Sequence, residues 1–210
     1  MAEEKIWEEG ACVMLYKNAL RIAEEWVEYF RPACARIEIK GSVLRRKAEP
    51  KDIEILAIPD LVPPASTKIE FGKPIPKKYK TRLDALLDTM IETEVCYLRA
   101  GGEKYKKIWL LKEYIQIDLF LVTPPAQWGV QSVIRTGPSD FSHWMVTKKS
   151  RGGALPDEYI VEGGAVGERV RGDKGDGRKG VIPMPEEIDF FQLCGLDWIE
   201  PIHRGAKWAR

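Results

Sequence analysis

Residues 35–58 read ARIEIKGSVLRRKAEPKDIEILAI, and this stretch decides the fold. Over residues 35–40 apolar and charged side chains alternate, which predicts a β-strand. Gly41-Ser42 ends that strand in a tight turn. A second strand is predicted over Asp52–Ile58, and Pro59 closes it. We therefore expect two strands joined through a glycine turn.

Two acidic side chains share one face of the second predicted strand. Residues two apart in a strand project from the same face, so Asp52 and Glu54 present two carboxylates side by side. A third acid, Asp118, stands within an apolar strand predicted over Tyr114–Val122. If the two strands are neighbours, three oxygen donors converge, and this is the ligand set that Mg²⁺ prefers for phosphoryl chemistry. The alternative is an ordinary solvated sheet face.

The turn between the two strands suits a phosphate group. Glycine lets the backbone approach a ligand closely, and the amides that follow can cradle phosphate oxygens. Arg45 and Arg46 can neutralise such a group. On its own Gly41-Ser42 is typical of any turn, but beside the acidic pair it indicates a nucleotide next to a metal.

The rest of the chain predicts two domains, residues 1–125 and 126–210, with the boundary at Pro124-Pro125. The first is expected to contain helices over Cys12–Phe30 and Arg82–Tyr97, an irregular loop over Leu61–Lys80, and antiparallel strands over Lys106–Leu111 and Tyr114–Val122. The second is expected to be helical over Trp128–Trp144 with a break at residues 136–138, β-like over Tyr159–Val161, a mobile basic loop over 163–180, helical over Pro185–Cys194, and a strand or turn over 198–201.

Composition narrows the class of protein. The 210 residues carry a net charge of +1 and 44% are hydrophobic, which is typical of a globular protein and excludes collagen-like, low-complexity and wholly disordered chains. Four cysteines without a Cys-x-x-Cys pair and two histidines make no ordinary zinc site. An acidic start and the lack of a long apolar run predict a cytoplasmic protein with no membrane partner, its cysteines buried as small hydrophobic side chains.

Taken in order, these motifs resemble those of a known family. Gly41-Ser42-Val43-Leu44-Arg45-Arg46 followed by Asp52-Ile53-Glu54-Ile55-Leu56 is similar to the nucleotidyltransferase signature of the DNA polymerase beta-like family, family X. Ile117-Asp118-Leu119-Phe120 resembles its third-carboxylate strand, and Thr136-Gly137-Pro138 before Phe141 resembles its Thr-Gly-Ser turn. The resemblance extends from about Ile37 to Arg204.

The resemblance implies an α+β fold: a nucleotidyltransferase palm with a mixed β-sheet and a smaller C-terminal α+β lobe. It implies a DNA-directed DNA polymerase that adds deoxynucleotides to a 3′-hydroxyl and releases pyrophosphate, in gap filling or repair. Asp52, Glu54 and Asp118 would hold two Mg²⁺ ions, for which Mn²⁺ substitutes, and Asp118 would help to deprotonate the attacking hydroxyl. The implied partners are deoxynucleoside triphosphates and a primer-template or gapped DNA duplex, and we expect a monomer.

The same resemblance assigns binding residues. Ser42 and Arg45 would hold the triphosphate. Contacts with the nucleotide are expected from Gly41, Ser42, Arg45, Lys51, Ile134, Arg135, Thr136, Gly137 and Ser139. Contacts with DNA are expected from basic clusters, each of which by itself is typical of a solvated face: Lys77, Lys78, Lys106, Lys107, Lys148, Lys149 and Arg151.

Several positions depart from the family pattern. Glu54 stands where aspartate is usual, and its longer arm still ligates magnesium. Pro138 replaces serine at a turn whose bond is cis in the family, so a cis Gly137-Pro138 bond is expected. Arg135 follows Ile134 where the family commonly has two aromatic residues under the sugar, and Val146 replaces an arginine that touches the template. No segment resembles the lyase or helix-hairpin-helix domains of larger members, so a minimal form is expected.

These departures leave two alternatives open. One is a nucleotidyltransferase that works without a template, or on RNA or a small molecule. The other is a non-catalytic nucleic-acid-binding protein on the same scaffold. Among the aromatic residues, Trp26, Trp109 and Trp198 are expected in the core, and Trp128 and Trp144 are the candidates for stacking on a base.

Overall fold

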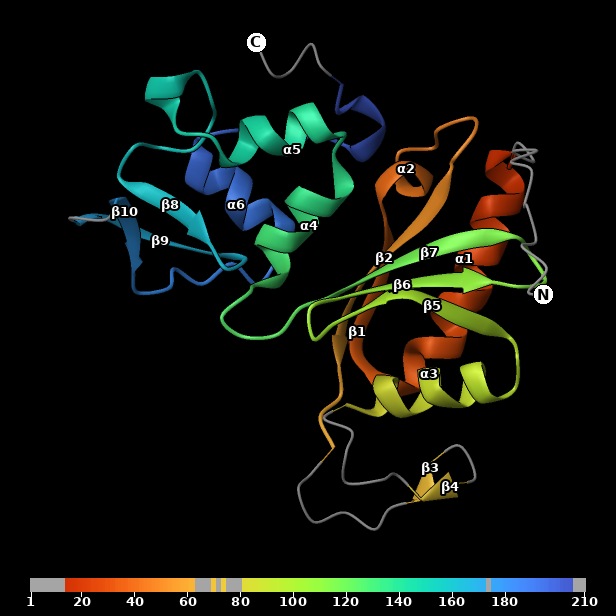
Figure 1. Ribbon diagram of the computed structural model, residues 1–210. Coiled ribbons are helices and arrows are strands. Elements are labelled where there is room, and N and C mark those ends of the chain that lie inside the picture. Colours follow the sequence, from red (N-terminus) through yellow and green to blue (C-terminus); the bar gives the residue numbers. More distant parts are fainter. Residues whose placement is uncertain (1–13, 63–68, 71–72, 75–80, 173–174, 206–210) are drawn as a thin grey trace, which may run out of the picture.

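The first half of the chain forms a five-stranded mixed sheet (Figure 1). The structure is a computed structural model and describes residues 14–62, 69–70, 73–74, 81–172 and 175–205. Across the sheet the strand order is β1-β2-β7-β6-β5, with β2 and β7 parallel and the other neighbours antiparallel. The strands are β1 (Cys34–Lys40), β2 (Asp52–Pro59), β5 (Cys96–Gly101), β6 (Tyr105–Leu110) and β7 (Ile115–Leu121).

Two helices, α1 (Tyr16–Phe30) and α3 (Arg82–Glu92), cover one face of this sheet. Their apolar stripes pack on the isoleucines and leucines that alternate with polar residues along β2 and β7, as a half-buried sheet requires. Thr81 caps α3, because its hydroxyl accepts the backbone N–H of Asp84. The polar residues of the same strands therefore point to the opposite face of the sheet.

A single helical turn, α2 (Gly41–Leu44), follows β1 where the sequence predicted only a tight turn. Gly41 has a φ of +63°, a left-handed conformation that glycine adopts readily and that ends the strand abruptly. Arg45 N–H then donates to the carbonyl oxygen of Gly41. The chain thus turns back toward β2 immediately above the acidic pair.

The C-terminal lobe packs three helices against a three-stranded antiparallel sheet of order β10-β9-β8 (Figure 1). Its core contains Phe141, Phe190 and Phe191, each fully buried. The break predicted in the first helical segment is confirmed, since it separates two helices. The elements are α4 (Trp128–Thr136), α5 (Ser139–Val146), η2 (Lys149–Arg151), β8 (Tyr159–Glu162), β9 (Ala165–Gly172), β10 (Gly175–Lys179), α6 (Glu187–Cys194) and η3 (Pro201–His203).

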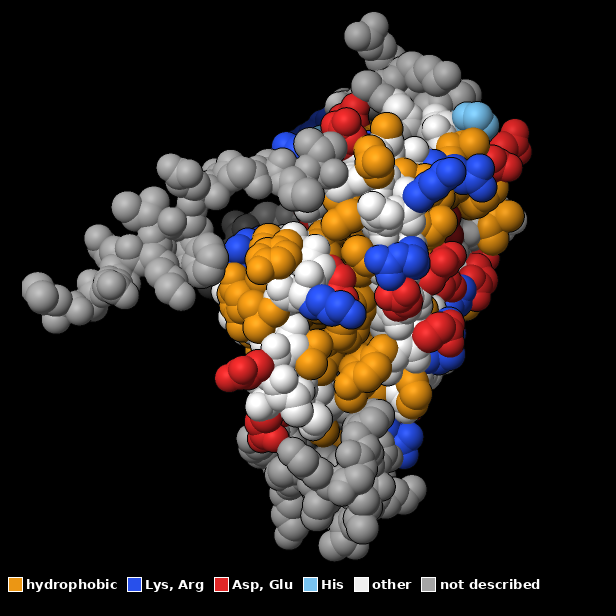
Figure 2. Space-filling model, turned by 90° about the vertical axis from the view of Figure 1, so that its right-hand side faces the viewer, with side chains coloured by type: hydrophobic (Ala, Val, Ile, Leu, Met, Phe, Trp, Pro, Cys, Tyr) orange, Lys and Arg blue, Asp and Glu red, His pale blue; other side chains and the backbone are white. Residues whose placement is uncertain are grey.

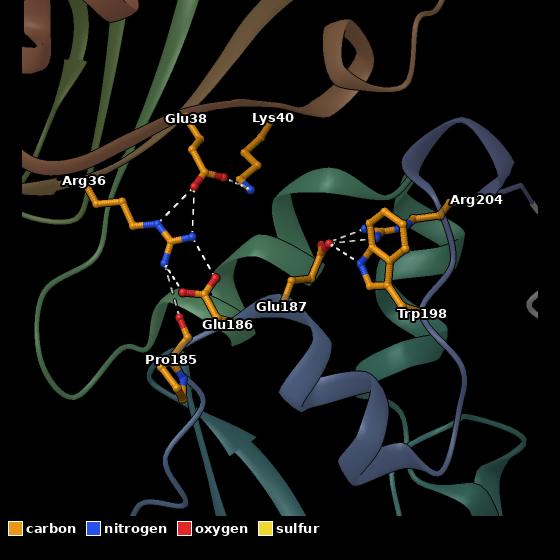
Figure 3. Close-up of polar contacts among 8 residues, drawn as sticks. All are labelled: Arg36, Glu38, Lys40, Pro185, Glu186, Glu187, Trp198 and Arg204. Carbon is orange, nitrogen blue, oxygen red and sulfur yellow. Dashed lines mark hydrogen bonds and ion pairs between the residues drawn. The ribbon is translucent and has the colours of Figure 1, made fainter.

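Paired charges, drawn in Figure 3, and one tryptophan join the lobe to the five-stranded sheet. Arg36 of β1 binds both carboxylate oxygens of Glu186, at 2.7 Å each, at the start of α6. Its guanidinium also lies 4.1 Å from the ring centre of Trp128, which is 5% exposed. Trp128 is therefore part of the junction, and the expectation that it stacks on a base is wrong.

The next residue of α6 fastens the last described segment of the chain. Glu187 accepts two hydrogen bonds from Arg204, at 2.7 and 2.8 Å, and one from the Trp198 indole at 3.1 Å (Figure 3). Burial opposes the charge of Glu187, but the bonds from Arg204 outweigh it and lower the pKa of this carboxyl below its usual value. The consecutive residues Glu186 and Glu187 thus bind two different parts of the molecule, β1 and the segment that ends at Arg204.

The predictions of two segments are wrong, and in both segments strands were missed. The helix predicted over Arg82–Tyr97 ends at Glu92, and β5 begins at Cys96. As an edge strand, β5 is exposed on both faces, so its sequence lacks the alternation that marks a strand. The segment 163–180, predicted to be a mobile loop, instead contains β9 and β10. Several positions of these strands are glycine, which has no side chain and so gives no strand pattern in the sequence.

The remaining predictions differ mainly at their ends. The N-terminal helix begins at Tyr16, and the last helix begins at Glu187, not Pro185. Most of the loop predicted over Leu61–Lys80 lies outside the described residues, which include a short pair of strands, β3 (Ile69–Glu70) and β4 (Lys73–Pro74). The segment 198–201 forms no strand and leads into η3. The expected α+β class with a mixed sheet is confirmed.

The other expectations concern the membrane and the cysteines. Within the described ranges, no helix is both long and apolar enough to cross a bilayer. Cys96 and Cys194 are buried, as predicted, and Cys34 is partly buried. Cys12 lies outside the described residues.

Candidate active site

Three carboxylates lie on the same face of β2 and β7, opposite the face that the helices cover. Glu54 is the direct neighbour of Asp118 in the parallel ladder, and Asp52 is the neighbour of Gln116. Neighbouring strands are about 4.8 Å apart, so the acids of the two strands stand one strand spacing from each other. The structure therefore brings together the three acidic residues that the sequence singled out.

Two side chains hold the carboxylate of Asp118. The Tyr105 hydroxyl and the Gln116 amide each donate a hydrogen bond of 2.9 Å to its Oδ1 atom. Burial, and after it the bond to Asp118, raises the pKa of Tyr105 to about 12, so the phenol stays protonated and donates. The Tyr105 ring stacks on Phe120 with 5.0 Å between ring centres. Atom Oδ2 of Asp118 makes no hydrogen bond among the described residues.

Glu54 points toward the Gly41-Ser42 turn. Its Oε2 atom accepts the Ser42 backbone N–H at 3.3 Å, and a Cβ atom at Gly41 would lie 1.4 Å from the same oxygen. Burial, and after it the charge of Asp52, raises the pKa of Glu54 to about 7. Burial and the charge of Asp118 also raise the pKa of Asp52. Burial is thus the larger cause for both residues, and the neighbouring carboxylates add to it.

The donor chemistry fits a hard divalent cation, although the side chains do not form a closed cage. In the part of the chain that the structure describes, no three His, Cys, Asp or Glu side chains converge on one point as a metal site requires. Asp118 is engaged by Tyr105 and Gln116, and Glu54 by Ser42. The acidic side chains of the face offer carboxylate oxygens, which suit Mg²⁺ or Mn²⁺.

Two arginines, from the end of α2 and from α4, lie beside the carboxylate face. Arg45 extends from the end of α2 and donates to the backbone carbonyl oxygen of Thr136 in α4. Arg135 lies 3.9 Å over the ring centre of Phe120. Burial lowers the pKa of both arginines, and the charge of Glu54 is the largest influence that opposes it in each. Neither arginine forms an ion pair with a described carboxylate, so both remain available to an anion.

Buried polar atoms near these arginines lack partners. The hydroxyls of Ser42 and Thr136 and the Nε atom of Arg135 are buried and make no hydrogen bond. An unsatisfied buried polar atom costs about 1–3 kcal/mol, so a cluster of them calls for a ligand or water. All three belong to residues that the sequence assigned to the nucleotide.

The other residues assigned to the nucleotide lie around this cluster. Lys51 is exposed just before β2, Ile134 is half-buried in α4, and Ser139 is exposed at the start of α5. At Gly137 a Cβ atom would lie 2.5 Å from the Phe141 ring, which explains the glycine. The Gly137–Pro138 bond is trans, against the prediction, which is the isomer that X–Pro bonds prefer, and both residues are extended between α4 and α5.

The lysines assigned to DNA have different surroundings. Lys107 is the ladder neighbour of Asp118 and shares the carboxylate face. Lys106 points to the other face and pairs with Asp84 of α3 at 2.8 Å. Lys148 lies 3.7 Å from Asp176, and Lys149 and Arg151 are exposed in η2. Lys77 and Lys78 lie outside the described residues.

Sequence reasoning missed Tyr105 and Gln116. Gln116 was open to prediction, because it precedes Asp118 by two residues and so shares its face. Tyr105 needs the register of β6 against β7, in which it pairs with Phe120. No protein-family model matches the chain, and a search of curated proteins finds no match. The candidate site is therefore assigned from its own residues.

Proposed function

We propose that this protein is a metal-dependent nucleotidyltransferase. The observation that carries the proposal is the set of three carboxylates on one sheet face beside two arginines that form no ion pair with described residues. Acidic side chains can bind metal cations, and guanidinium groups can pair with anionic phosphate oxygens. Together they suit a metal-bound triphosphate, which contains both. Within this class we propose a DNA-directed DNA polymerase of the family X type, with the β-sheet as its palm and the C-terminal lobe closing on the nucleotide.

The residues divide into metal ligands and phosphate ligands. Asp52, Glu54 and Asp118 would hold two Mg²⁺ ions, which when bound would neutralise the phosphate oxygens and stabilise the charge of the transition state. Ser42, Arg45 and Arg135 would contact the triphosphate. Glu54 now occupies the Ser42 N–H, so a turn of Glu54 toward the other acids would free that N–H for a phosphate oxygen.

The transfer reaction then uses Asp118. The 3′-hydroxyl oxygen forms a bond to the α-phosphorus while the bond between the α-phosphorus and its bridging oxygen to the β-phosphate breaks, and pyrophosphate leaves. Asp118 would accept the proton of the hydroxyl through Oδ2, since Tyr105 and Gln116 occupy Oδ1. The two donors also fix the direction of the carboxylate, which favours a productive approach.

Extension of a labelled primer tests this proposal. Wild type, Asp118→Asn and the exposed control Asp197→Asn would be compared on gapped duplex, recessed duplex and single strands, with Mg²⁺ or Mn²⁺. We expect templated addition by the wild type and the control and none by Asp118→Asn. No nucleotide addition by the wild type to any acceptor would contradict the proposal, and so would equal activity of Asp118→Asn.

One observation favours a second candidate, a transferase that works without a template or on an acceptor other than DNA. Arg135 lies against Phe120 and close to the charges of Glu54 and Asp118, at the position where the resemblance leads us to expect an aromatic residue under the sugar. Addition of ribonucleotides, or addition to single strands, would favour this candidate over the polymerase.

A further inference from the structure

The open face of the sheet continues beyond the carboxylates as an aromatic and basic surface. Strand register places Asp52, Gln116, Trp109 and Tyr97 in one row across four neighbouring strands. At about 4.8 Å between strands, Trp109 and Tyr97 lie about 10 and 14 Å from Asp52 along this row. The aromatic side chains therefore stand within reach of the reacting end of an extended acceptor.

Trp109 supports an exposed arginine on this surface and is not a core residue. It is half-buried on the open face, and the Arg99 guanidinium lies 4.0 Å from its ring centre. Arg99 is the extra residue of a bulge between Leu98 and Ala100, which turns its side chain over Trp109. Its Nε and Nη2 atoms also lie 3.4 Å from the Tyr97 hydroxyl. The stack holds the guanidinium in place with its outer face toward solvent.

The cations of this surface lack acidic partners. Neither Arg99 nor Lys107 forms an ion pair with any described carboxylate, whereas Lys106, on the opposite face of the same strand, pairs with Asp84. Tyr97 is 41% exposed. A held guanidinium, an ammonium group and an exposed ring on one surface are the groups that bind the phosphates and bases of a single strand.

We propose that Tyr97, Arg99, Lys107 and Trp109 form an acceptor platform that binds the single-stranded end of a nucleic acid beside the carboxylates. This inference rests on the proposed nucleotidyltransferase, because it assigns the acceptor of the transfer, and a single-stranded acceptor belongs to the second candidate, which works without a template. Figure 2 views the molecule from the side where α1 and the ends of β6 and β7 lie, and it shows hydrophobic, basic and acidic side chains mixed there. The bulge in β5 interrupts its free edge, which disfavours strand addition by a second copy of the chain.

Fluorescence anisotropy with a labelled oligothymidylate of about 12 nucleotides tests the platform. Nucleotide and divalent ions are left out, so that binding is measured apart from chemistry. The variants are Arg99→Gln and Tyr97→Ala. Tyr114→Ala, on the β6–β7 turn, and Arg21→Gln, on α1, are the matched controls. All four positions are exposed, and thermal melting checks that each variant is folded.

We expect each platform variant to bind the oligonucleotide about tenfold more weakly than wild type and each control to bind within about twofold. We also expect wild-type affinity to fall steeply between about 50 and about 200 mM salt. Unchanged affinity of both platform variants would overturn the inference. So would a dimer that Tyr97→Ala disrupts, because a second copy would then occupy the platform.

Activity separates this inference from the proposed function. If the wild type transfers nucleotides to a small hydroxyl compound but does not bind the oligonucleotide, the platform fails and the nucleotidyltransferase stands. If the platform variants lose binding as expected but the wild type transfers nothing to any acceptor, the nucleotidyltransferase fails and the platform stands.

Discussion

The carboxylate of Glu54 fills the space beside Gly41 that any larger residue would need. A Cβ atom at position 41 would lie 1.4 Å from Oε2 of Glu54, and Gly41 also has a left-handed φ of +63°. The glycine is thus required twice, once by the backbone and once by an acidic residue of the candidate site. This relationship joins the Gly41-Ser42 turn to the carboxylate face.

We predict that Gly41→Ala destabilises the protein by about 3 kcal/mol and abolishes nucleotide transfer, because Glu54 must move. Gly195→Ala is the matched control: its φ is +71°, and a Cβ atom there meets nothing within 4 Å. It should cost only the backbone strain, about 1 kcal/mol. Urea unfolding measures both variants. Equal losses at the two positions would show that Glu54 does not crowd Gly41.

The pH dependence of stability should report on Glu54. Its pKa of about 7 in the folded protein is above its ordinary value of 4.5, so the folded state binds more protons than the unfolded state between these values. The associated stability is fully present below about pH 4.5 and is lost as the pH rises through 7. Without divalent ions, Glu54→Gln should therefore be more stable than wild type near pH 8, by about 1–3 kcal/mol, and should lack this slope.

Thermal melting between about pH 5 and about pH 8 measures this effect. The exposed Glu158→Gln variant is the control and should follow the wild type. Adding Mg²⁺ near pH 8 should raise the melting temperature of the wild type more than that of Glu54→Gln. A wild-type curve that rises across this range would contradict the assigned pKa.

Tyr105→Phe removes one donor from Asp118 and leaves the ring on Phe120. We predict that kcat for nucleotide transfer falls about tenfold while KM stays nearly constant, because the lost bond orients the reacting carboxylate and not the bound nucleotide. Tyr114→Phe, at an exposed position on the β6–β7 turn, is the matched control for loss of a phenol. Steady-state kinetics of the variant and the wild type give kcat and KM. A change confined to KM would show that the hydrogen bond from Tyr105 does not orient Asp118 for the reaction.

The junction of the five-stranded sheet and the C-terminal lobe should depend on the Arg36–Glu186 pair. We predict that Arg36→Gln costs about 1 kcal/mol, because the pair is partly exposed and part of the loss comes from the contact with Trp128. The double exchange Arg36→Glu with Glu186→Arg should recover part of this loss. Arg21→Gln, which breaks the exposed pair with Glu25, is the control. Additive effects of the two exchanges in a double-mutant cycle would show that the pair contributes nothing.

The sequence was most informative where one face of an element is buried. Alternation marked β1 and β2 because their two faces meet different surroundings, and the same argument placed Asp52 and Glu54 on one side. β5 escaped prediction because it is an exposed edge, and β9 and β10 because their glycines carry no pattern. Short-range rules cannot find Tyr105 or Arg36, whose partners are set by strand register and by packing of the lobe.

The parallel pairing of β2 with β7 determines when the candidate site can form during folding. Antiparallel neighbours can pair through a short turn, but parallel ones need a long connection, and here that connection includes α3, β5 and β6. Glu54 and Asp118 are 64 residues apart in the sequence, so their pairing is a non-local contact, and such contacts form slowly. In a nascent or partly unfolded chain the acidic residues are far apart, so the three carboxylates come together only in the folded sheet.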